Sequence, residues 1–382
     1  MLDLFLDETH HQLRAVADRW VDVHLRPHTE KWEEEASFPR ELYAEAAAAG
    51  LIGATYPTEL GGDGGDVFHG LIVTEALVRG GSVGVAVGLG SHAIALPPIL
   101  NLGSEEQRRR FVPPVLRGEK IAALAVTEPG AGSDVANLRC KATREGGAYR
   151  LNGTKTFITS GVRADLVTVA ARTGEPGHGG LSLFVVERGT PGFTVGRALR
   201  KMGWWASDTA ELVFEDCMVP EENRIGDEDA GFYALMANFV PERLLLAAVG
   251  VAMARLALDE TERYIAQREA FGRPIGNFQV IRHRIAEMAT REEAARAFVA
   301  TVAERHRRGE DVIDQVAMAK NHASDACQYV CDQAVQLHGG YGYMREYVVE
   351  RLYRDARILP IGGGTTEIMR ELISRRRARG PG

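Results

Sequence analysis

The sequence predicts an α+β fold in which a helical first domain is followed by a small β-barrel and then by a helical bundle. Residues 1–119 follow a helical pattern, residues 120–230 follow the two-residue period of strands, and residues 231–382 return to longer helices. A chain of 382 residues is long enough for two or three domains with substantial cores. We therefore place the domain boundaries at residues 119/120 and 230/231.

The first region contains two clear helix signals. The alanine-rich run Glu45–Ala49 is a strong helix former, and Gly50 is placed to end that helix. Ser104 and Gln107 have capping-box spacing, which predicts the start of another helix. The segment Gly80–Gly90 is rich in small residues that permit a close approach to a neighbouring backbone or a ligand, although plain helix–helix contact is the simpler explanation.

The middle region reads as a series of short strands separated by glycine-containing turns such as Gly146-Gly147 and Asn152-Gly153. Many short strands with tight connections are typical of a small closed or nearly closed barrel. The predicted strands are Ile121–Val126, Ala148–Leu151, Lys155–Thr159, Leu166–Ala171, Ser182–Val186 and Glu211–Phe214.

The third region predicts long helices from Glu242 to about Ala270, from Phe278 to Arg307 and from Ile313 to Leu337, with a shorter helix after Tyr347. Proline fits the start of a helix because its missing N–H has no helical partner there. Since Pro241 precedes Glu242, we expect Glu242 in the first turn of its helix.

Composition narrows the class of protein. Hydrophobic residues make up 45% and charged residues 25%, as in soluble globular proteins, and the net charge of -7 disfavours a nucleic-acid binder. No window approaches about 18 uncharged apolar residues, so we expect no membrane span. The acidic N-terminus resembles neither a signal nor a transit peptide, which favours a bacterial-like cytoplasmic protein. The four cysteines lack metal-site spacing, so we expect no metal.

A glycine-rich loop, Thr127–Asp134, follows an apolar strand. Such a loop offers backbone N–H groups and hydroxyls to a phosphate, a carbonyl or a flavin edge. The segment matches neither the G-x-G-x-x-G fingerprint nor a Walker loop. Taken alone, an ordinary turn between strands explains it equally well.

Three further segments stand in a fixed order after this loop. They are Arg268–Gly272 followed by Gln279, Gln336–Tyr343 followed by Glu346, Arg351 and Asp355, and Ile361–Glu367. Together with Thr127–Asp134, they resemble the acyl-CoA dehydrogenase family over nearly the whole chain. The residues around Glu242 and the segments Met318–Lys320 and Ile368–Leu372 are most similar to those of the long-chain and isovaleryl-type members.

The resemblance implies a helical domain, a β-barrel and a helical bundle, assembled as a homotetramer (a dimer of dimers) with FAD in each subunit. It places the flavin ring against residues of the middle region, with Phe157 in place of the more frequent tryptophan. These residues are Leu124, Val126, Thr127, Gly132, Ser133, Phe157, Ile158 and Thr159.

The resemblance also implies contacts to the rest of the cofactor and to the substrate. Arg268, Phe271, Gln279, Gln336, His338, Gly339 and Gly340 would reach the diphosphate and adenine of an FAD bound mainly to a neighbouring subunit. Thr365 and Glu367 would hold the adenine side of the subunit's own FAD. The acyl-CoA would be bound by Ser133, Arg243, Gly363 and Gly364.

One position departs from the best-known family pattern. The catalytic glutamate of those members falls at Gly363, which has no side chain to remove a proton. Long-chain and isovaleryl-type members instead have the base in a Glu-Arg-Leu sequence, which matches Glu242-Arg243-Leu244. A carboxylate that merely complements a helix dipole is the structural alternative for Glu242. The vacancy at Gly363 favours Glu242 as the base, with the Gly363 N–H as an oxyanion donor.

The resemblance thus implies FAD-dependent α,β-dehydrogenation of an acyl-CoA to a trans-2-enoyl-CoA, as in fatty acid β-oxidation, with electrons passed to an electron-transferring flavoprotein. Two alternatives stay open: a flavin monooxygenase or oxidase on the same fold, and a catalytically inactive protein that binds acyl-CoA or flavin. The sequence leaves the length and branching of the acyl chain open.

Overall fold

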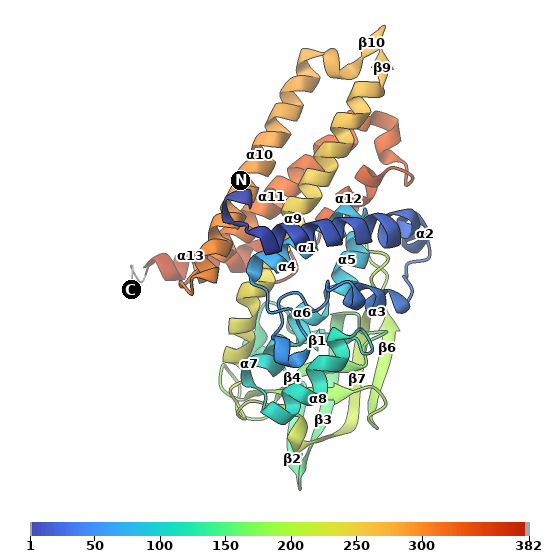
Figure 1. Ribbon diagram of the computed structural model, residues 1–382. Helices are drawn as coiled ribbons and strands as arrows, with labels where there is room; N and C mark the ends of the chain where they lie inside the picture. Colours follow the sequence, from blue (N-terminus) through green and yellow to red (C-terminus); the bar gives the residue numbers. More distant parts are fainter. Residues whose placement is uncertain (1, 379–382) are drawn as a thin grey trace.

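A computed structural model describes residues 2–378 and has the predicted order of helices, strands and helices. In Figure 1 the strands of the middle region gather at the lower end of the molecule and the long helices extend to the upper end. The first N-terminal helices cross between these two ends, and later ones lie over the strands in this view. The predicted fold class is therefore confirmed. The junction of the three parts is where the candidate site lies.

The N-terminal part consists of short helices. Both helix signals are confirmed: Gly50 follows the third helix with a φ of 76°, and Ser104 and Gln107 exchange the two capping-box hydrogen bonds at 2.8 and 3.2 Å. The helices are α1 (Glu8–Trp20), α2 (Thr29–Glu34), α3 (Glu41–Ala48), α4 (Val67–Arg79), α5 (Val83–Leu89), α6 (His92–Ala95), α7 (Pro97–Leu102) and α8 (Glu105–Leu116).

Small residues in α5 allow close approach to groups other than a helix. A Cβ at Gly84 would lie 3.0 Å from the backbone N of Ala206, in a loop of the middle region. A Cβ at Gly88 would lie 2.7 Å from the ring of Phe38. Simple helix–helix contact is therefore the wrong explanation at these two positions, where α5 packs on a loop and on an aromatic ring.

The middle part is an 8-stranded sheet. Two of the predicted strands are halves of one bulged strand, β3. The prediction missed β2 and β6, because both strands are largely exposed and lack an apolar face. The strands are β1 (Ala122–Ala125), β2 (Lys141–Glu145), β3 (Ala148–Thr159), β4 (Leu166–Arg172), β5 (Leu181–Glu187), β6 (Phe193–Ala198), β7 (Thr209–Pro220) and β8 (Arg224–Ile225).

The sheet wraps around its own core without closing. Its order is β6-β7-β3-β2-β4-β5-β8, with β1 beside β4, and no pairing joins β6 to β8 within residues 2–378. One residue pair, Lys141 with Arg172, links β2 to β4. The two halves enclose a core that includes Tyr149, Phe184 and Phe214. The barrel is thus nearly closed.

The C-terminal part is a bundle of long helices capped at its far end by a short hairpin (Figure 1). Its elements are α9 (Gly231–Gln267), β9 (Glu269–Ala270), β10 (Arg273–Pro274), α10 (Gln279–Arg307), α11 (Ile313–His338), α12 (Val348–Ala356) and α13 (Thr366–Ala378).

The predicted start of the first long helix is wrong. Helix α9 begins at Gly231, so Pro241 lies inside it and Glu242 is in its interior. Proline in a helix interior costs about 3 kcal/mol because it removes a hydrogen bond and crowds the preceding turn. The turns before Pro241 are anchored by tertiary contacts that offset this cost: Leu235 is fully buried, and the Asn238 side chain donates to the Ile94 carbonyl at 3.0 Å.

By length and composition alone, α9 is long and apolar enough to cross a membrane. The bent pair of segments 83–89 and 92–102 passes the same test when it is taken as one span. Both findings differ from the expectation that the chain has no such segment. Half of the apolar window of α9 is buried inside the molecule. The helix packs against α4, α10 and α11. Packing in the core of the bundle accounts for its apolar sequence.

Candidate active site

A cavity of about 1500 Å³ lies where the three parts of the chain meet. Its wall is formed by α4–α6, the loop after β1, the end of β3, the middle of α9 and the turn at residues 362–365. Typical small-molecule sites measure roughly 300–1000 Å³. The cavity is therefore large enough for more than one ligand group.

Glu242 projects from the middle of α9 into this cavity wall. Its Oε2 atom is buried and has no hydrogen-bond partner in the described chain. Burial raises the pKa of Glu242 to about 7, because an ionised carboxyl is poorly solvated there, while the charges of Arg243 and Lys320 oppose the rise. A carboxyl group poised near neutral pH is suited to general-base chemistry.

The turn at Gly363 and Gly364 lies beside Glu242. The two glycines have φ values of 65° and 99°, which residues with a side chain rarely adopt. A Cβ at Gly363 would lie 3.9 Å from Glu242 Oε1 but only 2.4 Å from Leu246 Cδ1. The backbone conformation thus favours glycine at 363, a Cβ there would displace the end of the Leu246 side chain, and the carboxylate of Glu242 occupies the space next to it.

Two buried cations hold this turn. Arg243 Nε donates to the Gly363 carbonyl at 3.0 Å, and the Lys320 ammonium donates to the Gly364 carbonyl. The sequence interpretation placed Arg243 in the substrate site but gave Lys320 no role. A signal was present, because Lys320 interrupts an apolar helical stripe that includes Val316, Ala323 and Cys327.

The structure brings the predicted flavin residues to the same cavity. Phe157 has a φ of 59° at the bulge of β3, and its side chain is 69% exposed while lining the cavity. An apolar ring left exposed by a strained backbone is a feature typical of a ligand site. The lining also includes Leu124, Val126, Thr127, Gly132, Ser133, Ile158 and Thr159.

A buried ion pair that the sequence interpretation missed holds this wall. Lys155 Nζ lies 2.8 Å from Glu128 Oε1 and donates to the Val126 carbonyl at 2.9 Å. The Glu128 carboxylate also accepts from the backbone N–H groups of Arg139 and Cys140 at 2.7 and 2.8 Å. The pair therefore joins both ends of the glycine-rich loop to the bulged strand.

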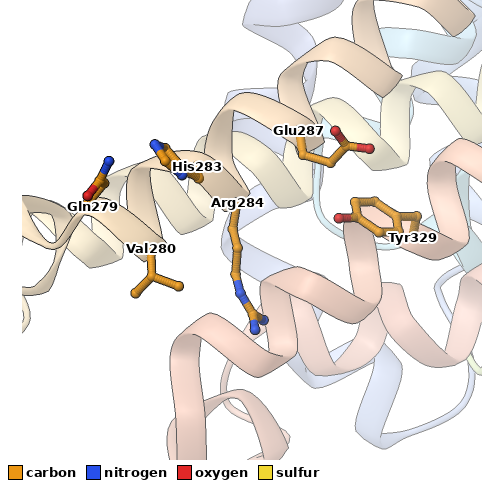
Figure 2. A pocket seen from close by; sticks show the side chains of 6 residues that line it. All are labelled: Gln279, Val280, His283, Arg284, Glu287 and Tyr329. Carbon is orange, nitrogen blue, oxygen red and sulfur yellow. The ribbon is translucent and has the colours of Figure 1, made fainter.

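The predicted contacts to the far half of FAD lie elsewhere. Phe271 is 95% exposed in the hairpin between β9 and β10, at the end of the bundle away from the strands (Figure 1). Gln279 borders a separate groove of about 450 Å³ between α10 and α11, with His283, Arg284, Glu287 and Tyr329 (Figure 2). The residues of this group outside the cavity lining are Arg268, Phe271, Gln279, Gln336, His338, Gly339 and Gly340.

Some of the remaining predicted residues line the cavity, and the others lie outside it. Gly364 and Thr365 line the cavity with Arg243, whereas Glu367 is exposed on α13. His338 is buried at the end of α11, where its Nδ1 lies 2.7 Å from the Ala334 carbonyl and its ring stacks on Tyr264. Gln279 borders the groove between α10 and α11, and Phe271 lies exposed in the hairpin between β9 and β10.

Two further residues, His92 and Trp204, also line the cavity. The buried His92 has its Nδ1 2.8 Å from the Leu89 carbonyl, and burial lowers the pKa of its imidazole. Trp204 lines the cavity and donates its backbone N–H to Asp355 Oδ1 at 2.6 Å.

One group of side chains has the composition of a metal site. His10, Asp66 and His69 offer ligand atoms within 4.8 Å of one another. Each imidazole, however, accepts a backbone N–H at its Nδ1, from Asp7 or Asp66, at 3.1 Å. The Nε2 atom of His10 lies 2.9 Å from Asp66 Oδ1. The cluster is thus explained as two linked helix caps, with Arg307 3.1 Å from Asp66.

Comparison with known proteins agrees with this geometry. Family models for the N-terminal, middle and C-terminal domains of acyl-CoA dehydrogenase match residues 7–119, 123–217 and 229–378. The mitochondrial long-chain specific acyl-CoA dehydrogenase of Sus scrofa is 42% identical over 370 residues, which cover 96% of this chain and 86% of that protein.

Solved structures match over nearly the whole chain. A probable acyl-CoA dehydrogenase from Mycobacterium abscessus has a TM-score of 0.96 at 50% identity, covering 97% of this chain and 99% of that one. An acyl-CoA dehydrogenase from Bacillus anthracis complexed with FAD has a TM-score of 0.92 at 32% identity, covering 98% of this chain and 68% of that one.

Proposed function

From the premise that this chain belongs to the acyl-CoA dehydrogenase family, and is therefore an FAD-dependent oxidoreductase acting on CH–CH bonds, we propose that Glu242 removes the α-proton of its acyl-CoA substrate. The observation that supports this role is the unpaired carboxylate oxygen of Glu242, buried beside the Gly363 turn in the largest cavity described. The product of the reaction is the trans-2-enoyl-CoA.

The residues present fit the cofactor. An apolar ring at Phe157, hydroxyls at Thr127, Ser133 and Thr159, and a glycine at 132 line one side of the cavity. Aromatic faces and backbone or hydroxyl donors are groups that bind a flavin ring. An FAD held by these residues would supply a hydride acceptor for the β-hydrogen. The volume left on the Glu242 side accommodates an acyl chain.

Glu242 and the glycine turn have separate roles in the removal of the α-proton. A thioester α-proton is weakly acidic, so its removal requires both a base and a donor to the developing oxyanion. The Glu242 carboxylate accepts the proton, and the Gly363 N–H donates to the thioester oxygen. Apolar residues of α9, including Leu245, Leu246 and Val249, exclude water from the reacting carbon.

This arrangement also argues against a catalytically inactive protein. Taken from the sequence alone, the absence of a glutamate at 363 suggests an enzyme that has lost its base. The three-dimensional position of Glu242 removes this reason, because its carboxyl lies beside residue 363. A side chain at 363 would start 3.9 Å from Glu242 Oε1, so the carboxylate of Glu242 serves the same region of the cavity.

The same proposal covers the surroundings of the reaction. Electron-transferring flavoprotein is the proposed acceptor, fatty acid β-oxidation the proposed pathway, and the cytoplasm the proposed location. A homotetramer is proposed because Phe271 in the hairpin and Tyr343 after α11 are 95% and 79% exposed, and further copies of the chain would cover them. The far set of residues around Arg268 and Gln279 would then reach a neighbour's FAD.

Replacement of Glu242 by Gln tests the proposed function. Turnover of a panel of acyl-CoAs with an artificial electron acceptor should fall by roughly 10²–10⁴-fold, the usual contribution of a positioned base. FAD content and acyl-CoA binding should stay close to wild type, because the amide keeps the shape of the side chain. Glu371→Gln, on the exposed face of α13, is the matched control. Turnover that survives Glu242→Gln would place the base elsewhere.

A further inference from the structure

The Gly363–Gly364 turn is held by two cations that come from different helices. Arg243 on α9 donates to the Gly363 carbonyl at 3.0 Å, and Lys320 on α11 donates to the Gly364 carbonyl. Both side chains are buried, and that of Lys320 is completely inaccessible. Each of two adjacent peptide groups is thereby held by a buried cation.

A fully buried lysine is unusual because desolvation of an ammonium group is costly. A neutral donor would suffice to bind one carbonyl oxygen, so the hydrogen bond alone does not account for a charge at this place. The nearby anionic group is the carboxylate of Glu242, whose charge favours the ammonium form of Lys320. Burial and the charge of Arg243 act in the other direction and lower the pKa of Lys320 to about 8.

The charged groups around this turn are few. Helix α9 contributes Glu242 and Arg243, and α11 contributes Lys320. Helix α10 contributes His306 to the cavity wall, with a pKa lowered by burial. Helix α12 contributes Arg354 to the lining, and Arg357 follows that helix. Thr365 and Ile368, before and in the first turn of α13, are uncharged. Lys320 and Arg243 are thus the cations that act on the Glu242 carboxyl.

We propose that Lys320 is a positioning residue for the dehydrogenation: it fixes the turn that presents the Gly363 N–H, and its charge keeps Glu242 ionised between turnovers. This inference rests on the proposed role of Glu242 as the base. Proton uptake by Glu242 leaves two neighbouring cations without an anionic partner. The same charge therefore favours release of the proton before the next substrate arrives.

Two replacements separate the hydrogen bond from the charge. In Lys320→Gln an amide N–H can still donate to the Gly364 carbonyl, whereas the charge is removed. In Lys320→Met both are removed at a similar side-chain length. Replacement of a buried charge by an apolar group of similar volume is often tolerated by the fold.

The acid limb of kcat/KM should distinguish the variants. If loss of the Lys320 charge raises the apparent pKa of the base by about one unit, kcat/KM of Lys320→Gln falls about tenfold near pH 6 and recovers at high pH. Lys320→Met should show the same shift and a further loss of kcat at every pH, because the oxyanion donor is no longer fixed. Lys120→Gln, which removes a lysine outside the cavity lining, should leave the limb unchanged.

A second readout does not depend on electron transfer. Exchange of the substrate α-hydrogen with D₂O, measured without an electron acceptor, reports proton removal directly. Exchange by Lys320→Gln should be slowed at pH 6 and close to wild type at pH 9. Calorimetry with a non-reactive acyl-CoA thioether should show little change in affinity, which separates positioning from binding.

The outcomes discriminate between this inference and the proposed function. If Glu242→Gln is inactive while both Lys320 variants have the wild-type acid limb and exchange rate, the role of Lys320 is overturned and that of Glu242 stands. If Glu242→Gln stays active, both fail. Should Lys320→Met not fold, Lys320→Gln decides the question through its pH profile.

Discussion

At the scale of single residues, the proposed chemistry depends on a carboxyl group in an environment that disfavours its charge. Glu242 has one oxygen without any hydrogen-bond partner in the described chain. A neutral side chain at this position would make the folded state more stable, so the proposed catalytic role explains why a carboxyl group is buried here. Two predictions belong to this scale.

The first prediction concerns pH. The folded-state pKa of Glu242, about 7, exceeds its ordinary value of 4.5, so this group favours the folded state at low pH and the benefit is lost as pH rises through 7. Glu242→Gln should therefore gain melting temperature relative to wild type as the pH goes from 5 to 8, measured by thermal denaturation. In wild type, kcat/KM should rise through the same range, because the base must be ionised.

A difference in melting temperature between Glu242→Gln and wild type that is constant from pH 5 to 8 would contradict the assigned pKa. Glu371→Gln provides the reference for a glutamate that is exposed.

The second prediction concerns Gly363. An alanine there must adopt a φ of 65° and would place its Cβ 2.4 Å from Leu246. We expect Gly363→Ala to lower the free energy of unfolding by about 3 kcal/mol, from backbone strain and overpacking together. Urea denaturation measures this loss.

Gly309→Ala is the matched control, because Gly309 has a φ of 76° and open space around it. It should cost only about 1–2 kcal/mol, the backbone term alone. Adding Leu246→Ala to Gly363→Ala should remove the clash; an equal loss at Gly309 and Gly363 would show that no clash exists.

At the scale of elements, the bulge of β3 and the loop after β1 act as one unit. The Glu128–Lys155 pair joins them, and the next residues of β3 present Phe157 to the cavity. The pairing of β3 with β7 is irregular between Lys155 and Ile158, so the strand alone does not fix the position of Phe157. The buried ion pair therefore has a role in shaping the site.

The third prediction tests this unit. Lys155→Met leaves the Glu128 carboxylate buried without its cation, which should cost about 3–5 kcal/mol of unfolding free energy. The variant should also retain less FAD after gel filtration, because the glycine-rich loop loses its anchor. The double variant Lys155→Met with Glu128→Gln should recover part of the stability. Equal unfolding free energies of the single and the double variant would show that the two side chains do not interact energetically.

At the scale of the whole molecule, the three parts meet at buried polar groups as well as at the cavity. Asp355 on α12 accepts the backbone N–H of Trp204 from the middle region at 2.6 Å, and Arg351 donates to the Gly81 carbonyl of the first region at 2.7 Å. Burial and the negative charge of Glu33 raise the pKa of Asp355 to about 7. The junction thus contains a carboxyl group that favours its neutral form.

The fourth prediction follows from the sign of that shift. Because the folded-state pKa of Asp355 is raised from 3.8, its contribution to stability is lost as pH rises through about 7. Asp355→Asn keeps an oxygen for the Trp204 N–H and should flatten the decline of melting temperature between pH 5.5 and 8.5. Asp332→Asn, exposed on α11, should leave the decline intact. An unchanged slope in Asp355→Asn would exclude this carboxyl as its source.

The sequence by itself determined the order of the three parts, the helix caps at Gly50 and Ser104, and the residue types that form the cavity. These features are local or periodic, since a capping box spans four residues and the period of a strand or helix is visible in any window. The motifs also sufficed to identify the family, which the comparisons confirm.

Only the tertiary structure decided where Glu242 and Lys320 lie relative to the Gly363–Gly364 turn. The local signal of Pro241 predicted a helix start, but burial of Leu235 and Asn238 against the other parts extends α9 to Gly231 and places Glu242 in its interior. Lys320 is 78 residues beyond Glu242 in the sequence, and they act on one turn only because α9 and α11 pack together. The pKa of a carboxyl and the role of a buried ammonium depend on which charges surround them and how much water is excluded, and long-range packing sets both.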